Sequence, residues 1–123
     1  TSDILVLLLP LTASTENTLD AQALAQMPKG AVIINPGRGP LIDDAALLDA
    51  LNAGHIAHAT LDVFRIEPLP ADHAFWAHPQ VTVTPHIAST TRADTASEVI
   101  AHNIARVEAG QTLLHQVDRK AGY

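Results

Sequence analysis

The chain has 123 residues, enough for one domain or a large part of one, and its net charge of −6 argues against a nucleic-acid partner, which requires clustered Lys and Arg. It contains no cysteine, which excludes disulfides and thiolate metal sites and agrees with a cytoplasmic location. No apolar run is long enough to cross a membrane, and a hydrophobic content of 47% with 3% aromatic residues predicts an aliphatic core.

The first half of the chain predicts strands that alternate with helices. Residues 4–9 form a continuous aliphatic run that ends at a proline, which is typical of a strand buried on both faces. Helix starts are expected at acidic residues that precede apolar segments. In chain order, the prediction is a strand at 4–9, a loop at 11–18, a helix from Asp20 through Met27, a strand at 31–35, an irregular loop at 36–40, and a helix from Asp43 or Asp44 to Gly54.

The second half continues the alternation and then forms a long helix. Apolar residues that recur every three or four positions indicate this helix, and a glycine follows its last turn. In chain order, the prediction is a strand at 56–62, a loop at 67–70, a helical turn at 73–78, a strand at 81–84, a helix from Thr90 or Thr91 to Ala109, and a polar tail at 111–123.

Strands that alternate with helices indicate a parallel sheet with right-handed crossovers. We therefore expect an α/β fold that corresponds to the C-terminal half of a Rossmann-like, doubly wound sheet, with about four strands. The Gly37-Arg-Gly39 segment is not the GxGxxG fingerprint that binds dinucleotide phosphates. A sheet truncated in this way has a bare edge, so we expect a missing N-terminal half or pairing with another chain.

Polar residues follow the predicted strands where each one ends. Because the carboxyl ends of parallel strands lie along one edge, where open α/β sheets bind ligands, we expect Arg38, Asp62 and His86 to converge there. Glu67 follows Asp62 closely enough to reach His86. Arginine binds carboxylates through paired hydrogen bonds, histidine exchanges protons near neutral pH, and a carboxylate orients the imidazole. Such a set suits the reduction of a 2-oxo acid with hydride from a cofactor.

Each of these residues also has an ordinary structural explanation. An arginine in a Gly-Pro loop is commonly solvated, a histidine at a strand end is as often structural as functional, and a glutamate before proline commonly belongs to a turn. Spacing alone therefore indicates no more than a ligand-binding α/β domain. His55 and His58 share no helical face and have no carboxylate well placed beside them, so we expect no metal site.

Four segments of the sequence together match the motifs of a known family. They are Leu9-Pro-Leu-Thr12 with Thr15, Gly30 to Gly39 with Leu41-Ile-Asp43, Leu61-Asp-Val-Phe64 with Glu67-Pro-Leu-Pro70, and Val83-Thr-Pro-His-Ile-Ala88. They occur in the family's order over nearly the whole chain, so the sequence resembles the D-isomer-specific 2-hydroxyacid dehydrogenases. The stretch from Trp76 through Pro85, with the Tyr123 ending, most resembles the glyoxylate/hydroxypyruvate reductase branch.

The resemblance implies a role for each matched residue. Arg38 would bind the carboxylate and keto oxygen of a small 2-oxo acid, His86 would protonate the keto oxygen, and Glu67 would hold His86 protonated. NAD or NADP would be the cofactor, and the full-length parent is expected to be a homodimer that binds neither nucleic acid nor membrane. The residues that match cofactor-binding positions are Leu9, Pro10, Leu11, Thr15, Pro36, Gly37, Asp62, Ala88 and Ser89.

The resemblance also implies a domain organisation. Residues 1–110 would be the C-terminal portion of the NAD(P)-binding domain, and residues 111–123 a tail that returns to a missing substrate domain. The family's phosphate-binding glycine loop would lie upstream, so we expect the isolated chain to be inactive or nearly so. The alternative is a non-catalytic interaction protein, because related corepressors keep the same trio but act by dinucleotide-sensed dimerisation. Turnover of glyoxylate or hydroxypyruvate distinguishes the two.

Overall fold

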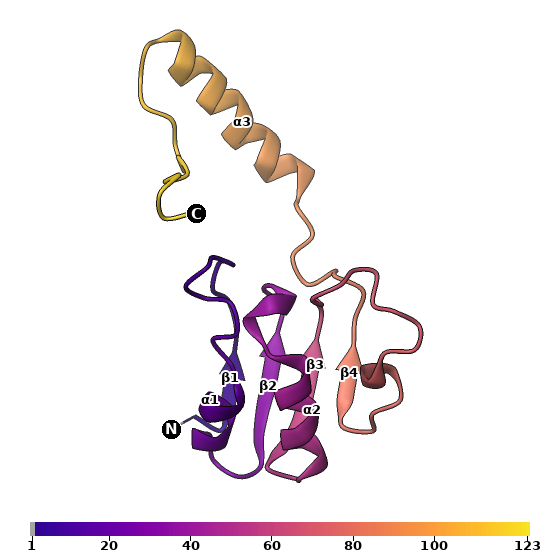
Figure 1. Cartoon of the computed structure of the whole chain (residues 1–123). Helices are drawn as coiled ribbons and strands as arrows, with labels where there is room; N and C mark the ends of the chain where they lie inside the picture. The colour runs from indigo at the N-terminus through magenta and orange to yellow at the C-terminus, as the bar shows by residue number, and fades with distance from the viewer. Residues whose placement is uncertain (1) are drawn as a thin grey trace. The chain divides into compact units, whose positions relative to one another are not determined.

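The computed structural model describes residues 2–123, which separate into two compact units, one that ends at Ala88 and one from Ser89 to Tyr123 (Figure 1). The first unit contains a parallel sheet in the order β1-β2-β3-β4. This arrangement confirms the predicted α/β fold. The strands are β1 (Ile4–Val6), β2 (Ala31–Asn35), β3 (Ile56–Leu61) and β4 (Val81–Val83).

Two α-helices cover one face of this sheet. α1 (Ala21–Gln26) follows β1, and α2 (Asp44–Asn52) follows β2. Both begin where the sequence predicts, because the carboxylates of Asp20 and Asp43 each accept a hydrogen bond from a backbone N–H of the first turn. The chain steps from β1 to β2 to β3 in one direction, so crossovers of one hand place both helices on the same face (Figure 1).

The core of the first unit lies between these helices and the sheet. Ile33 and Ala59 of the central strands are fully buried, together with Leu24 of α1 and Leu47 and Leu51 of α2. Burial of one such aliphatic side chain stabilises the fold by roughly 1.5–3 kcal/mol. A helix of six residues, such as α1, is not stable alone in water, so this packing is what holds it.

β1 differs from the prediction in both length and burial. Only residues 4–6 form the strand, although the backbone N–H of Leu7 still donates to the carbonyl of Ile34 at 2.9 Å. Ile4 is 59% exposed and Leu8 is 73% exposed, so the expectation of a strand buried on both faces is wrong. β1 is the edge strand of the sheet. In the described part of the first unit, α1 and α2 both pack on the face of the sheet opposite to the side chains of Ile4 and Leu8, which explains their exposure.

β3 and β4 are joined by a loop that contains only a single turn of 3-10 helix, Ala74–Trp76. This turn confirms the prediction of a helical turn in the segment 73–78. Its start is fixed by His73, whose Nδ1 accepts a hydrogen bond from the backbone N–H of Phe75 at 3.2 Å. Because Phe75 is buried in the core, the loop is anchored to the sheet and carries Glu67 to the edge beside β4.

The second unit consists of α3 (Ala93–Glu108) and the tail that follows it. α3 begins later than Thr90 or Thr91, because Arg92 takes the N-cap position and pairs with Asp94 at 2.8 Å. The tail folds back onto α3 through the Asn103 side chain, which bonds both backbone groups of Leu114. No helix within residues 2–123 is long and apolar enough to cross a membrane.

The sequence assigns residues 1–110 to an NAD(P)-binding domain and residues 111–123 to a tail that returns to a substrate domain. The division of this chain after Ala88 is a different property and does not test those limits. They remain a prediction.

Candidate active site

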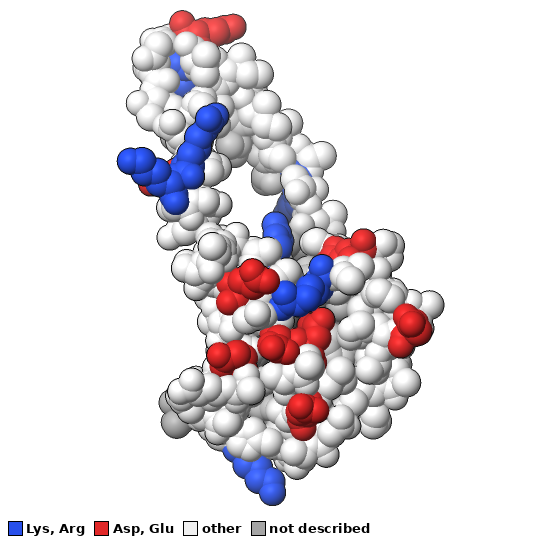
Figure 2. Space-filling model, in the orientation of Figure 1, with Lys and Arg blue, Asp and Glu red and all other residues white. Residues whose placement is uncertain are grey.

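Three of the predicted site residues follow the carboxyl ends of parallel strands at one edge of the first unit. Arg38 follows β2, Asp62 directly follows β3, and His86 follows β4. The sheet is parallel throughout, so these strand ends lie side by side, as the sequence predicts. On the face of the first unit shown in Figure 2, acidic side chains are interspersed with a few basic ones.

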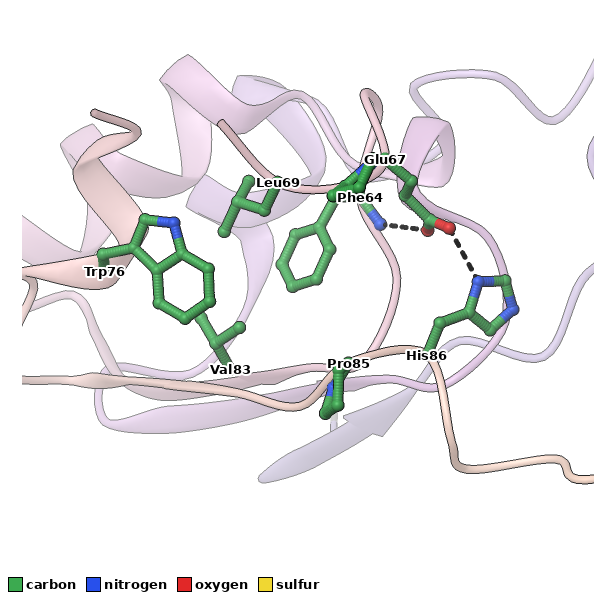
Figure 3. A pocket seen from close by; sticks show the side chains of 8 residues that line it. Phe64, Glu67, Leu69, Trp76, Val83, Pro85 and His86 are labelled. Atoms are coloured by element: carbon green, nitrogen blue, oxygen red, sulfur yellow. Dashed lines mark hydrogen bonds and ion pairs between the residues drawn. The ribbon is translucent and has the colours of Figure 1, made fainter. Parts of the chain in front are cut away.

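A hydrogen bond between Glu67 and His86 is the centre of the candidate site (Figure 3). His86 Nδ1 lies 2.7 Å from Glu67 Oε2. An ionised carboxylate can only accept, so Nδ1 carries a proton and donates it, which leaves Nε2 for a ligand. Both side chains are partly exposed, so a ligand can reach the imidazole.

The Glu67 carboxylate is itself fixed by the backbone. Its Oε1 accepts a hydrogen bond from the N–H of Phe64 at 2.9 Å. Burial raises the pKa of Glu67, but the hydrogen bonds from Phe64 and His86 outweigh it. The positive charges of His86 and Arg38 act in the same direction, so the pKa of Glu67 lies below its ordinary value. Glu67 is therefore an anion near neutral pH.

Asp62 lies beneath the turn that carries His86. It is 3% exposed, and its Oδ1 accepts hydrogen bonds from the Thr84 hydroxyl and, at 3.0 Å, from the N–H of Ile87. Its Oδ2 accepts from the N–H of Ala88 at 2.8 Å. Burial raises the pKa of Asp62, but these three hydrogen bonds and the charge of His86 lower it below its ordinary value. Both carboxylate oxygens are thus engaged within the protein.

Asn35 fixes the loop that presents Arg38. It is 1% exposed, its Nδ2 donates to the carbonyl of Arg38 at 3.0 Å, and its Oδ1 accepts from the N–H of Gly37 at 3.1 Å. The guanidinium of Arg38 is exposed and donates to the carbonyl of Gly37 at 2.7 Å. Asn35 was not among the predicted site residues. The available signal was a polar residue at the end of an aliphatic strand, just before Pro-Gly.

The two glycines of this loop allow close packing of the backbone. A Cβ atom on Gly37 would lie 2.7 Å from the carbonyl oxygen of Leu7, and one on Gly39 would lie 1.9 Å from the carbonyl carbon of Phe64. Both distances are shorter than any non-bonded contact allows. The loop is therefore packed against the segment after β1 on one side and the segment after β3 on the other.

Arg65 joins three loops at this edge and was also not predicted. Its Nη2 donates to the carbonyl of Ile42 at 2.7 Å and to the side chain of Asn17, and its Nη1 donates to Glu16 at 3.1 Å. One guanidinium thus connects the loop after β1, the loop after β2 and the loop after β3. No sequence motif distinguishes this arginine from a solvated one.

The loop after β1 contains four of the residues predicted to bind a cofactor. Thr15 closes this loop, because its hydroxyl donates to the carbonyl of Pro10 at 2.7 Å and accepts from the N–H of Thr12 at 2.8 Å. Leu9 and Leu11 are exposed. The four loop residues are Leu9, Pro10, Leu11 and Thr15. Of the other predicted cofactor-binding residues, Pro36, Gly37 and Ala88 lie at neighbouring strand ends. Ser89 is the first residue of the second unit.

An apolar pocket of about 470 Å³ adjoins the Glu67–His86 pair. In Figure 3 this pair lies at one end and Trp76 at the other. The indole Nε1 of Trp76 donates to the carbonyl of Pro70 at 2.9 Å, so the ring is held at the pocket rim. The remaining lining residues are Phe64, Pro68, Leu69, Val83 and Pro85.

The histidines considered as metal ligands have other partners. His55 Nε2 contacts the carbonyl of Leu24 at 3.1 Å, and His58 Nε2 contacts the hydroxyl of Thr82 at 3.0 Å. Within residues 2–123, no group of three His, Asp or Glu side chains is arranged to hold a metal ion.

Residues 1–88 match the family model described as D-isomer specific 2-hydroxyacid dehydrogenase, NAD binding domain. The chain belongs to this family. The predicted family is therefore confirmed. The chain is 48% identical over 120 residues to glyoxylate/hydroxypyruvate reductase A of Serratia proteamaculans. It is 44% identical over 120 residues to glyoxylate/hydroxypyruvate reductase A of Salmonella paratyphi B. These matches cover 98% of this chain and 38% of each relative, so the chain spans about 38% of their length.

Solved structures of 2-hydroxyacid dehydrogenases have the same fold. A D-isomer specific 2-hydroxyacid dehydrogenase from Xanthobacter autotrophicus Py2, in complex with NADPH and MES, is 52% identical with a TM-score of 0.96. That match covers 99% of this chain and 50% of the other. An NADPH-dependent glyoxylate/hydroxypyruvate reductase from Sinorhizobium meliloti, in complex with NADP and sulfate, is 40% identical with a TM-score of 0.93, covering 99% and 40%.

Proposed function

We propose that the protein carrying this chain reduces small 2-oxo acids of the glyoxylate/hydroxypyruvate type with NAD(P)H. The observation that carries this proposal is the 2.7 Å hydrogen bond between Glu67 and His86, at the strand-end edge that also holds Arg38. Reduction of a 2-oxo acid requires a proton donor, an anchor for the carboxylate and a source of hydride. The described residues offer the first two.

His86 is the proposed proton donor. With Nδ1–H bonded to Glu67, Nε2 is the nitrogen that transfers a proton. As hydride adds to C2 of the oxo acid, the electron pair of the C=O bond moves to oxygen, which takes the proton from Nε2. The neighbouring carboxylate of Glu67 stabilises the positive imidazolium before that transfer and fixes the plane of the ring.

Arg38 is the proposed anchor for the substrate carboxylate. Its exposed guanidinium offers a planar set of donors that fits a carboxylate through two parallel hydrogen bonds. The backbone of Arg38 is held by Asn35, so the anchor is presented from a fixed loop. The positive charge of Arg38 contributes to lowering the pKa of Glu67.

The chain's own residues fit a nicotinamide ring near this edge. Leu9 and Leu11 expose aliphatic surface at the end of β1, where an aromatic ring face finds apolar contact. We propose that these residues, with Pro10, Thr15, Pro36, Gly37, Asp62 and Ala88, hold the nicotinamide end of the cofactor. The cofactor supplies the hydride.

The relatives support the finer parts of this proposal. Two solved relatives contain NADPH or NADP, which favours NADPH over NADH as the reductant. The curated relatives named glyoxylate/hydroxypyruvate reductase A favour small 2-oxo acids as substrates. We further expect a homodimer that works in the cytoplasm.

The test is an assay of the protein at its full natural length. Oxidation of NADPH and of NADH is followed with glyoxylate and with hydroxypyruvate, and the 123-residue chain, for which we expect little turnover, is a second sample. His86→Gln should lower kcat by about 10²–10⁴-fold, because it removes the proton donor. Arg38→Lys should raise the KM for the oxo acid, since lysine lacks the planar fork. His102→Gln and Arg92→Lys, both on exposed positions in the second unit, are the matched controls.

The proposal fails if the full-length protein turns over neither acid with either cofactor. It also fails if His86→Gln retains the wild-type kcat. A protein that binds NADPH and dimerises but shows no turnover would favour the corepressor-type alternative.

A further inference from the structure

The short helical turn that begins at Arg38 is held at both of its ends by side chains. This turn of 3-10 helix, η1 (Gly39–Leu41), has Arg38 as its N-cap. At its start, the side chain of Asn35 donates to the carbonyl of Arg38 at 3.0 Å. At its end, Nη2 of Arg65 donates to the carbonyl of Ile42 at 2.7 Å. The backbone that presents Arg38 is therefore fixed in part by a side chain from the loop after β3.

The loop after β3 also carries Glu67. Arg65 lies two residues before Glu67, and the N–H of its other neighbour, Phe64, donates to the Glu67 carboxylate at 2.9 Å. Gly39 packs so closely against this loop that an added Cβ would lie 1.9 Å from the carbonyl carbon of Phe64. The guanidinium of Arg65 thus forms a short bridge between the turn that presents Arg38 and the loop that carries Glu67.

The bridge depends on the planar set of donors that a guanidinium offers. Nη2 of Arg65 donates to the carbonyls of Ile42 and Pro40 and to the side chain of Asn17, and Nη1 donates to Glu16. The Glu16 side chain is 52% exposed, so this ion pair contributes little. The bonds of Nη2 therefore hold the turn, and a single ammonium group could not make all of them from one position.

A 2-oxo acid that is anchored by its carboxylate must present its keto oxygen to the proton donor. The protein must therefore keep the anchor and the donor at a constant separation, because a misplacement of about 1 Å can lower the rate about 10²-fold. We propose that Arg65 is a positioning residue that fixes the separation between Arg38 and the Glu67–His86 pair. The inference rests on the proposed function, because it assumes that Arg38 binds the substrate and that His86 transfers a proton.

A double-mutant cycle tests this role in the protein at its full natural length. Arg65→Lys is measured alone and in combination with Arg38→Ala, with enough enzyme to follow the slow variants. We expect Arg65→Lys alone to lower kcat/KM for the oxo acid by about tenfold. In the Arg38→Ala background it should lower kcat/KM by less than about twofold, because no anchor remains to be misplaced. If Arg65→Lys does not fold, Arg65→Gln, with a shorter planar donor group, replaces it in the cycle.

Arg106→Lys is the matched control for the substitution. The Nε of Arg106 donates to the carbonyl of Thr112 at 2.6 Å within the second unit, so the same change is made at another arginine that bonds a backbone carbonyl. We expect kcat/KM of Arg106→Lys to stay within about twofold of the wild type.

Hydrogen exchange reports on the turn without activity. The amides of Leu41 and Ile42 bond to the carbonyls of Arg38 and Gly39 within the turn. Their exchange should become at least about tenfold faster in Arg65→Lys, because the end of the turn loses its support. The amide of Leu47 in α2 bonds to a carbonyl of its own helix and is the internal reference.

The outcomes distinguish this inference from the proposed function. An unchanged kcat/KM in Arg65→Lys, or equal losses with and without Arg38, overturns the positioning role. A rise confined to the KM for NADPH also overturns it, and assigns Arg65 to the loop after β1. If the wild-type protein shows no turnover, the proposed function itself fails, and unchanged exchange at Leu41 and Ile42 would show that Arg65 does not hold the turn either.

Discussion

Glu67 and His86 are joined by a 2.7 Å hydrogen bond across 19 residues of sequence, and the second oxygen of the same carboxylate is bonded to the backbone N–H of Phe64. Glu67 therefore meets the imidazole from a fixed position. A carboxylate that was free to rotate would stabilise the charge of His86 but would not set the direction of its ring. The double attachment provides both effects.

Replacing Glu67 with glutamine should separate these effects. The amide of Glu67→Gln has one oxygen and can accept from Phe64 or from His86, but not from both through separate oxygens. We expect kcat/KM for the oxo acid to fall by about 10–100-fold, since the imidazolium loses its anionic partner. Steady-state kinetics measure this change. Glu98→Gln, on an exposed position of α3, is the control, and equal losses in both variants would contradict the role of Glu67.

The contribution of Asp62 to stability should depend on pH. Its pKa is lowered in the folded protein, so its contribution is present above the ordinary pKa of an aspartate and is lost as the pH falls through the lowered folded value. At neutral pH, Asp62→Asn should reduce the free energy of unfolding by roughly 2 kcal/mol.

Urea unfolding of both proteins between about pH 7 and about pH 3 measures this difference. The difference between wild type and Asp62→Asn should shrink at the acid end. Because Glu67 is present in both proteins, its own titration affects the difference little. A difference that stays constant or grows toward low pH would rule out the stated cause.

Adding a methyl group at Gly39 should disrupt the contact between two loops of the site. The Cβ of Gly39→Ala would lie 1.9 Å from the Phe64 carbonyl carbon, so one backbone segment must move. We expect a loss of about 3 kcal/mol in the free energy of unfolding, together with loss of activity. Gly30→Ala is the comparison, because its Cβ enters open space and only its positive φ costs about 1 kcal/mol. Thermal unfolding of the two variants measures the contrast, and equal losses would show that the close contact is not important.

Replacing Arg65 with lysine should loosen the three loops that it joins. A lysine has a single ammonium group and cannot reach Glu16, Asn17 and the carbonyl of Ile42 in the same geometry. Arg65→Lys should destabilise the protein by roughly 1–2 kcal/mol, measured by urea unfolding. Arg92→Lys changes an exposed ion pair and should have an effect near zero. If Arg65→Lys leaves the free energy of unfolding unchanged, the hydrogen bonds of Arg65 do not stabilise the three loops.

Local signals in the sequence predicted much of the first unit. The bounds of β2 agree with the aliphatic run 31–35, and α1 and α2 begin at acidic caps, because strand periodicity and helix capping depend on neighbours in the chain. The burial of β1 was predicted wrongly. An aliphatic run shows that a strand has apolar side chains, but which other elements cover them depends on where the strand lies in the sheet.

The sequence by itself determined the α/β fold, the family and the three strand-end residues Arg38, Asp62 and His86, because these depend on residue order and on the shared direction of parallel strands. Only the tertiary structure decided which of them touch. It gave the expected pair of Glu67 and His86 its hydrogen bond, placed Asp62 under the histidine turn, and brought Arg65 across three loops. These contacts depend on the relative placement of loops that are far apart in the chain, and no local pattern of residues encodes that placement.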